Sequence, residues 1–350
     1  MYQLPEKLKK LVPYEPLKGD YVIRADANES FLSPPTYLRS QIANVISQIE
    51  FNRYPDPNCT ELCNQFAGFF DLNAAHVAAG NGSDELIGLI ISSFTSQGDS
   101  MAVVSPDFSM YAFYAQMCGV KVETFSKEKN DLALDIDAFI AFAQENQVSL
   151  VILSNPCNPT SLSASREDVI KIVDRLDCLV VIDEAYMEFT EGSVLDLANS
   201  RDNLIVLKTC SKAFGMAAIR LGFAVSNPTI INALRAVKSP YNVNAMTQAV
   251  GCLLFEQEAY LNTCIEKIKQ SRDKLYQLIF SLKKEKTDIL ELVNTQANFV
   301  FLRVTEPEKV YRSMLKRGIA IRRLGCYLRI SASSVEENQA IVTALSEILQ

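Results

Sequence analysis

Short polar stretches that directly follow apolar runs hold the side chains of this sequence that could do chemistry. Residues 155–160 (NPCNPT) follow the run LVILS, residues 183–186 (DEAY) follow LVVI, and residues 209–212 (TCSK) follow LIVLK, with Arg220 shortly beyond. A further stretch, residues 80–83 (GNGS), precedes a helical pattern. In an open α/β sheet, ligands bind beyond the carboxyl ends of the strands, so we expect these stretches to meet at one site.

Together these stretches supply the groups that a phosphorylated pyridine aldehyde needs. Its ring nitrogen, if it is to stay protonated, needs a buried carboxylate, which Asp183 offers, and its aldehyde needs an amine, which Lys212 offers. Asn158 and Tyr186 are placed to hold its phenolic oxygen. Its phosphate needs backbone N–H groups at a helix start, hydroxyl groups and a cation. The candidates for the phosphate are Gly82, Ser83, Asp84, Thr209, Ser211 and Arg220.

Each of these features has a simpler explanation when it is taken alone. An aspartate at a strand end is often only a turn former or helix cap, and a lysine is most often a solvated surface charge. A Gly-Asn-Gly-Ser stretch before a helix is about as often a plain turn as an anion site. All of them together are much harder to obtain by chance, and we therefore interpret them as one cofactor site.

The apolar runs predict the elements that position this site. They are too short for helices and continuously apolar, which is typical of strands buried on both faces in a mostly parallel sheet. We expect these strands at 101–105, 150–154, 179–183, 204–208 and 221–225. Amphipathic stretches between them predict helices at 84–95, 108–118, 135–144 and 166–176. The alternation predicts an α/β domain over residues 40–245.

The rest of the chain has a different character. Residues 247–284 predict a long helical region of one or two helices, residues 297–304 and 327–332 predict strands, and residues 335–349 predict a closing helix. We expect residues 246–350, together with residues 1–39, to form a smaller α+β domain.

Composition and charge argue against several other classes of protein. The net charge is −7, with acidic and basic residues interspersed, which disfavours a nucleic-acid partner. The nine cysteines show no repeated spacing and the only histidine is His76, so we expect free thiols and no metal site. No apolar run has the length of a signal peptide or a membrane span, which predicts a cytoplasmic protein with no membrane partner.

The stretch 209–220 (TCSKAFGMAAIR) resembles the cofactor-lysine motif of fold-type I aminotransferases, and the whole chain is similar to the histidinol-phosphate aminotransferase family. The matching motifs follow in family order over almost the full length. They are PYEP (13–16), ADANES (25–30), RYPDP (53–57), GNGSDE (80–85), DFSMY (107–111), NPCNPT (155–160), DEAYMEF (183–189), SPYNVN (239–244), ANFVF (297–301), and LRIS with EEN (328–338).

This resemblance implies a two-domain fold with a seven-stranded type of sheet, pyridoxal 5'-phosphate as cofactor, and a catalytic role for Lys212, Asp183 and Tyr186. Lys212 would hold the cofactor as a Schiff base and move the proton between substrate and cofactor. Phe108, where relatives usually have tyrosine, would stack on the ring. Tyr54 would reach the phosphate of the partner subunit, which implies a homodimer with shared active sites. Asn28, Arg322 and Arg329 would bind the substrate.

The sequence departs from the family pattern around the substrate. Ser161 follows Asn-Pro-Thr where the family usually has glycine, and a positive φ there would cost about 1 kcal/mol or more relative to glycine. Ser30 replaces the usual proline after Asn-Glu, the loop 323–328 is short, and Ser333-Ser334 replaces the usual Gly-Thr.

Two arginines before the loop are candidates to join Arg329 on a substrate anion. Because strand side chains alternate between faces, Arg322 and Arg323 should point in opposite directions, and we expect Arg322 to be the partner. A phosphate dianion favours two guanidinium groups, which fits histidinol phosphate as amino donor and 2-oxoglutarate as acceptor. An aminotransferase for aromatic or other amino acids, a threonine-phosphate decarboxylase and a non-catalytic regulatory domain are the alternative interpretations.

Overall fold

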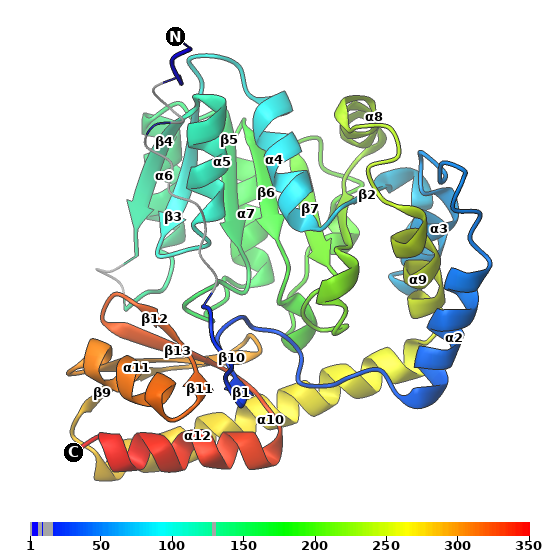
Figure 1. Cartoon of the computed structure of the whole chain (residues 1–350). Helices are drawn as coiled ribbons and strands as arrows, with labels where there is room; N and C mark the ends of the chain where they lie inside the picture. The colour runs from blue at the N-terminus through cyan, green and yellow to red at the C-terminus, as the bar shows by residue number, and fades with distance from the viewer. Residues whose placement is uncertain (1, 6–8, 10–16, 128–130) are drawn as a thin grey trace.

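A seven-stranded sheet dominates the computed structural model, which describes residues 2–5, 9, 17–127 and 131–350 (Figure 1). The strand order is β2-β8-β7-β6-β5-β3-β4. All neighbours run parallel except β8, which is antiparallel to both β2 and β7. The strands are β2 (Val77–Gly80), β3 (Ser100–Ser105), β4 (Lys121–Ser126), β5 (Leu150–Ser154), β6 (Leu179–Asp183), β7 (Leu204–Thr209) and β8 (Gly222–Val225).

Helices cover both faces of this sheet, which explains why its inner strands are continuously apolar. In β5, Leu150 and Ile152 belong to the core under one set of helices, and Val151 and Leu153 belong to the core under the other set. The first set is α4 (Ser83–Phe94), α5 (Met110–Cys118) and α8 (Pro228–Val237). The second set includes α3 (Thr60–Phe69), α6 (Ile136–Glu145) and α7 (Arg166–Arg175). The five predicted strands and four predicted helices are confirmed to within two residues at each end.

A smaller antiparallel sheet in the order β12-β13-β10-β9 lies beside the large one. Its strands are β9 (Ile289–Val293), β10 (Phe299–Val304), β12 (Arg322–Leu324) and β13 (Tyr327–Ser331), and it is accompanied by α11 (Pro307–Lys316) and α12 (Val335–Ile348). Near it, the N-terminal arm forms β1 (Ile23–Arg24), which pairs in parallel with β11 (Ile319–Ala320). Ser334, one of the departures from the family pattern, caps the N-terminus of α12 in a capping box with Glu337.

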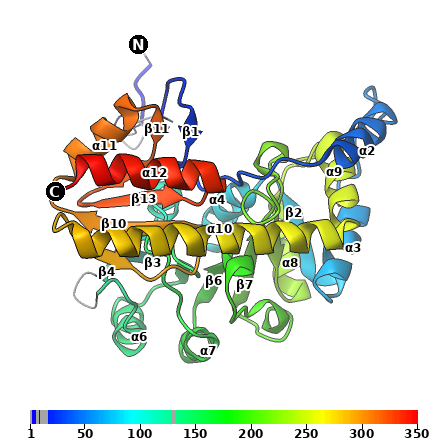
Figure 2. The same ribbon diagram turned by 90° about the horizontal axis from the view of Figure 1, so that it is seen from below.

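The long helix α10 (Glu258–Glu285) joins the two parts of the molecule, as Figure 2 shows from below. Leu261 and Ile268 in its first half belong to the core of the large sheet, and Leu275 and Ile279 in its second half belong to the core of the small sheet. With α9 (Ala245–Phe255), it makes two helices of the region 247–284. The division of the chain into domains at 40 and 245 stays a prediction.

Other expectations concern the N-terminal motif, membrane spans, metal ions and the cysteines. The motif PYEP (13–16) lies outside the described residues. Among the residues that the structure describes, no helix is long and apolar enough to cross a membrane, and no cluster of histidine, cysteine and acidic side chains could hold a metal ion. All nine cysteines are free thiols.

Candidate active site

Three polar stretches meet at the carboxyl end of the large sheet because β5, β6 and β7 are parallel neighbours. Ser154 at the end of β5 lies opposite Asp183 at the end of β6, and Asp183 lies opposite Leu207 in β7. The chain therefore delivers residues 155–158, 183–186 and 209–212 side by side at the carboxyl ends of the strands. This is the edge at which open α/β sheets bind their ligands.

Asp183 is a buried carboxylate held by two donors. The Tyr111 hydroxyl donates to its Oδ2 at 2.8 Å and the Ala185 N–H donates to its Oδ1 at 3.1 Å. Burial raises the pKa of Asp183 to about 7, against the lowering effect of these hydrogen bonds. Asp183 forms no ion pair with any described residue, so a protonated ring nitrogen would supply the missing counter-charge.

Sequence reasoning missed Tyr111, the donor to Asp183. It lies inside the motif DFSMY (107–111), but an aromatic residue in an apolar helix resembles an ordinary core residue. The structure places it fully buried in α5, with its ring packed edge-on against Phe108 at 5.5 Å between centroids. Phe108 is half-buried beside it, so one turn of chain carries the ring-stacking candidate and the partner of Asp183.

Lys212 lies close to Tyr186, at the start of the loop that follows β7. Its Nζ donates to the carbonyl oxygen of Ala27 at 3.1 Å and lies 5.9 Å from the centre of the Tyr186 ring. The Tyr186 hydroxyl accepts a hydrogen bond from Asn28 Nδ2 at 2.9 Å. The N-terminal arm therefore reaches the lysine and the tyrosine together.

The start of α4 and the loop after β7 form a cradle suited to a phosphate. Arg220 Nη1 lies 3.4 Å from Ser211 Oγ, and Arg220 Nη2 lies 3.6 Å from Asp84. A Cβ on Gly82 would come within 2.8 Å of Arg220 Nη2, and a Cβ on Gly222 would come within 2.3 Å of the Ser83 nitrogen. At Gly222 the clash would be with backbone, so glycine is what lets β8 approach the helix start so closely.

Two hydroxyl groups and one amide complete this side of the site. Thr209 and Ser211 are both buried, and the Ser211 N–H donates to Thr209 Oγ1 at 3.2 Å. Asn158 is half-buried, and its backbone N–H donates to Ser154 Oγ at 3.1 Å. Asn158 Oδ1 accepts from Arg329 at 2.5 Å, which leaves the amide NH₂ as a donor for a phenolic oxygen.

Arg322 and Arg329 lie on the same face of the small sheet. Their Cα atoms are direct partners across β12 and β13, and directly opposed strand residues share a face. Arg329 is buried and donates through Nη2 to the carbonyl oxygen of Asp26 at 2.7 Å. Arg323 is exposed and pairs with Glu308 at 2.7 Å, as expected for a side chain on the other face.

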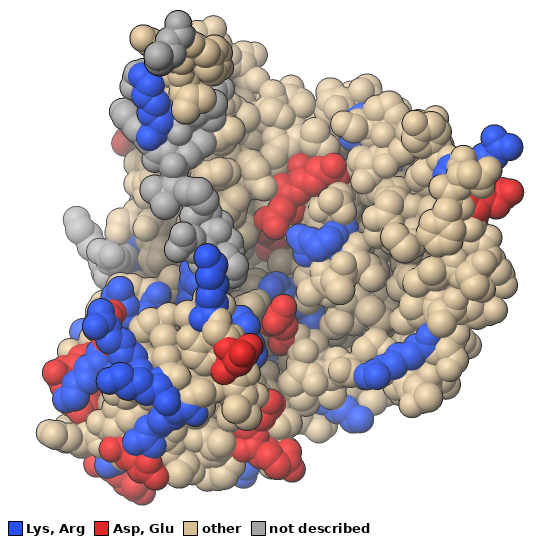
Figure 3. Space-filling view, in the orientation of Figure 1, with Lys and Arg blue, Asp and Glu red and all other residues tan. Residues whose placement is uncertain are grey.

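Asn28 connects the N-terminal arm, the small sheet and the end of β6. It has φ 56°, and besides the bond to Tyr186 its Oδ1 accepts from Ser331 Oγ at 3.1 Å while its carbonyl accepts from Asn298 at 3.0 Å. Ser331 ends β13, so Asn28 ties the arm to the small sheet and to the end of β6. Figure 3 shows this face hollowed between the two parts of the molecule, with both basic and acidic side chains around the hollow.

Ser161 has φ 65°, a left-handed backbone conformation that costs a serine free energy relative to glycine. Its buried hydroxyl offsets that cost through contacts that a glycine cannot make. Ser161 Oγ accepts from the backbone N–H groups of Gln296 at 2.9 Å and Ala297 at 2.8 Å, and lies 3.0 Å from Thr295 Oγ1. The serine thereby fastens the turn that carries Asn158 to the loop that leads into β10.

Tyr54 stands apart from the residues described so far. Its ring is 80% exposed and stacks on Tyr241 at 4.4 Å between centroids. Within the described chain, it has no hydrogen bond or ring contact with the phosphate candidates. A role for Tyr54 at a phosphate therefore needs a second copy of the chain.

A lysine, a buried carboxylate and an anion cradle at the carboxyl edge of this sheet define the class of pyridoxal-phosphate-dependent enzymes. The family model "Aminotransferase class I and II" matches residues 25–345. A histidinol-phosphate aminotransferase of Clostridium kluyveri is 41% identical over 99% of this chain and 98% of its own length. One of Clostridium novyi is 35% identical over 97% and 95%. The chain therefore belongs to the class I and II aminotransferases and uses pyridoxal phosphate.

Solved structures agree on the fold, which is fold type I. A histidinol-phosphate aminotransferase of Sinorhizobium meliloti in complex with pyridoxal-5'-phosphate superposes with a TM-score of 0.87 over 99% of this chain and 98% of its own, at 22% identity. An L-threonine-O-3-phosphate decarboxylase of Porphyromonas gingivalis gives 0.80 over 93% and 99%, at 20% identity. Fold likeness therefore does not separate amino transfer from decarboxylation.

Proposed function

We propose that the chain transfers the amino group of histidinol phosphate to 2-oxoglutarate, as a cytoplasmic enzyme of histidine biosynthesis. The observation that carries this proposal is the pairing of Arg322 with Arg329 on one face of the small sheet. Histidinol phosphate has no α-carboxylate, and its phosphate dianion favours two guanidinium groups over one. The histidinol-phosphate aminotransferase of Clostridium kluyveri, similar over nearly its full length, supports the same substrate.

The residues at the sheet edge fit pyridoxal phosphate, which supplies an aldehyde and an electron-withdrawing ring when it is bound. Lys212 offers the amine that bonds to the aldehyde, and the same amine moves the proton at the substrate carbon. Asp183 would keep the ring nitrogen protonated, and Phe108 would stack on the ring. Asn158 and Tyr186 would donate to the phenolic oxygen. The phosphate would be held by Gly82, Ser83, Asp84, Thr209, Ser211 and Arg220.

The substrate end is formed by Arg322, Arg329 and Asn28. Arg329 already binds Asn158 and the carbonyl of Asp26, so its guanidinium is oriented before a substrate arrives. Arg322 supplies the second cation that a phosphate dianion requires. Asn28 holds the Tyr186 hydroxyl and so links substrate binding to the cofactor ring.

The active form in this proposal is a homodimer in which Tyr54 reaches the phosphate of the partner subunit. The exposed stack of Tyr54 on Tyr241 supports it, because large aromatic rings left in water mark a contact surface. Phe51 and Met246 add apolar surface nearby in the sequence, at 72% and 46% exposure.

The test is a panel of amino donors offered with 2-oxoglutarate, following glutamate and carbon dioxide together. We expect glutamate to form fastest from histidinol phosphate, with no carbon dioxide released from any donor. Faster turnover of an unphosphorylated aromatic donor would favour a general aminotransferase. Carbon dioxide from threonine phosphate would favour the decarboxylase.

A further inference from the structure

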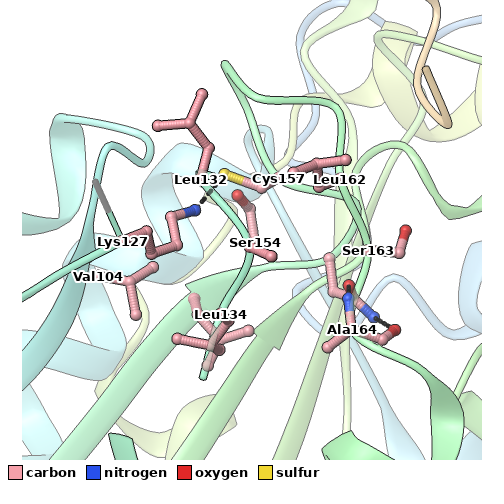
Figure 4. Close-up of a pocket in the computed structure, with 12 residues that line it drawn as sticks. Val104, Lys127, Leu132, Leu134, Ser154, Cys157, Leu162, Ser163 and Ala164 are labelled. Atoms are coloured by element: carbon pink, nitrogen blue, oxygen red, sulfur yellow. Dashed lines mark hydrogen bonds between the residues drawn. The ribbon is translucent and has the colours of Figure 1, made fainter. Parts of the chain in front are cut away.

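A buried lysine and a buried cysteine lie in direct contact outside the residues assigned to cofactor and substrate. Lys127 Nζ donates to Cys157 Sγ at 3.1 Å, as Figure 4 shows, and the two side chains are 3% and 4% exposed. The thiol in turn donates to the carbonyl oxygen of Pro106 at 3.5 Å. The nitrogen thus faces the sulfur, and the thiol proton points away from it.

A small cavity adjoins this pair. Lys127, Ser154 and Cys157 line it together with leucines such as Leu132 and Leu134, and its volume is about 30 Å³. A cavity needs only about 10–15 Å³ on this measure to hold one water molecule. A molecule of two oxygen atoms, such as hydrogen peroxide, therefore fits beside the sulfur.

We propose that Lys127 and Cys157 are a modification site at which hydrogen peroxide forms a reversible nitrogen–sulfur cross-link. In the first step, the Cys157 sulfur attacks peroxide, the O–O bond breaks and one water leaves, which gives a sulfenic acid. In the second step, Lys127 Nζ gives up a proton and attacks this sulfur, an S–N bond forms and the hydroxyl leaves as a second water. One thiol, one amine and one peroxide thus give one sulfenamide and two waters, so sulfur is oxidised by two electrons and peroxide is reduced by two.

Burial slows the first step and favours the second. Burial raises the pKa of the Cys157 thiol, so little thiolate is present at neutral pH and oxidation requires sustained peroxide. Once a sulfenic acid has formed, the closest nucleophile is the nitrogen already in contact. The flexible lysine chain needs only a small rotation to reach bonding distance, whereas another thiol would have to enter the core.

The cross-link would act on the turn that carries Asn158. Lys127 follows β4 and its N–H donates to the Ser105 carbonyl at 2.8 Å, so one end of the bond is anchored to the sheet. Cys157 directly precedes Asn158, whose Oδ1 orients Arg329. Oxidation therefore restrains Asn158, which lies between the cofactor ring and Arg329. This consequence rests on the proposed function.

The experiment treats the cofactor-loaded protein with graded hydrogen peroxide, blocks the remaining thiols and maps the tryptic peptides by mass. We expect residues 122–129, uncut after Lys127, joined to residues 130–166, with a combined mass lower by two hydrogen atoms than the sum of the two peptides. Dithiothreitol should release both peptides. Amino transfer should fall in proportion to the cross-linked fraction and return with dithiothreitol.

Three controls keep the result specific. Lys127→Met and Cys157→Ser should each abolish the joined peptide, and either variant alone suffices if the other fails to fold. Cys210, equally buried but without a lysine hydrogen bond among the described residues, should stay unlinked.

The cross-link is overturned if Cys157 passes to sulfinic acid, or stays reduced, with no joined peptide under peroxide that oxidises the exposed Cys118 and Cys326. This mass readout does not depend on which amino donor the enzyme uses. A joined peptide with undiminished amino transfer would overturn the coupling to the active site.

Discussion

The cofactor side and the substrate side of the active site are built in different ways. Residues 155–158, 183–186 and 209–212, which hold most of the residues proposed for the cofactor ring, follow three neighbouring parallel strands, so the sheet delivers these stretches to one end. The residues proposed to bind the substrate come from the N-terminal arm and the small sheet. Among the described residues, hydrogen bonds such as Asn28 to Tyr186 at 2.9 Å and Arg329 to Asn158 at 2.5 Å join the two sides. In the proposed site, the large sheet thus places most residues for the cofactor, and the arm and the small sheet place the residues for the substrate.

The largest effect should come from removing the cofactor lysine. Lys212→Ala should still bind pyridoxal phosphate through the phosphate cradle, but amino transfer should fall by at least about two orders of magnitude, because both the bonding amine and the proton carrier are lost. In the wild type, borohydride should attach the cofactor covalently to Lys212, which peptide mapping detects. Near-normal turnover in Lys212→Ala would show that the sheet edge is not the catalytic centre.

The next largest effect should come from the buried carboxylate. Asp183→Asn keeps the shape of the side chain, yet kcat should fall by roughly two orders of magnitude, because the ring nitrogen loses the charge that keeps it protonated. Tyr111→Phe is the matched control, since it removes one hydrogen bond to Asp183 and leaves the charge in place. A loss of only a few-fold in Asp183→Asn would make this residue structural.

The pH dependence of stability provides an independent check on Asp183. Burial raises its pKa in the folded, cofactor-free protein to about 7, above the ordinary value of 3.8. The folded state then binds the proton more tightly than the unfolded state, so this group's contribution to stability is present below about pH 4 and is lost as the pH rises toward 7. Urea unfolding of the cofactor-free Asp183→Asn variant should lack this part of the pH dependence.

A smaller effect should come from Tyr54, which can reach a phosphate only in a second subunit. Tyr54→Phe should weaken cofactor binding by the contribution of one charge-assisted hydrogen bond, about 1.5–3 kcal/mol, while the fold is unchanged. Mixing Tyr54→Phe with inactive Lys212→Ala protomers should form heterodimers with one intact site and restore part of the activity. A dilute monomer with full activity would rule out shared sites.

The smallest effect should come from Ser161, whose hydroxyl joins the turn that carries Asn158 to the loop before β10. Ser161→Gly relieves the positive φ but leaves the buried Ala297 N–H without its acceptor, so we expect a net loss of about 1 kcal/mol in the free energy of unfolding. Ser161→Ala is the matched control and should lose more, because it keeps the strained backbone and also removes the hydroxyl. Urea denaturation measures both. A more stable Ser161→Gly would mean that the hydroxyl contributes less than the positive φ costs.

The residues proposed for the cofactor have more local sequence signal than those proposed for the substrate, for physical reasons. Most cofactor candidates lie next to an apolar strand that is buried on both faces of the sheet, and that signal is local. The edge strand β4 (KVETFS) lacks this signal because it is partly exposed, and β8 is apolar throughout although it runs antiparallel. Apolarity therefore reports burial rather than strand direction.

Contacts between distant segments have no local signal. The bond between Asn28 and Tyr186 spans the arm and the large sheet, and the hydroxyl of Ser161 finds its partners beyond residue 290. Tyr111 was overlooked for the same reason, since its partner Asp183 lies in a different element. The opposite faces of Arg322 and Arg323 could be predicted, because alternation along one strand is a local rule.

The measurement that tests the proposed function most directly is the ratio of kcat/KM for histidinol phosphate to that for an unphosphorylated aromatic donor, in the wild type and in Arg322→Ala. Losing one of two charge-assisted contacts to phosphate removes about 1.5–3 kcal/mol, so the ratio should fall by about one to two orders of magnitude. Arg323→Ala, altered at the neighbouring position on the other face, should leave the ratio unchanged. A ratio that Arg322→Ala does not change, or a wild type that prefers the unphosphorylated donor, would contradict the account.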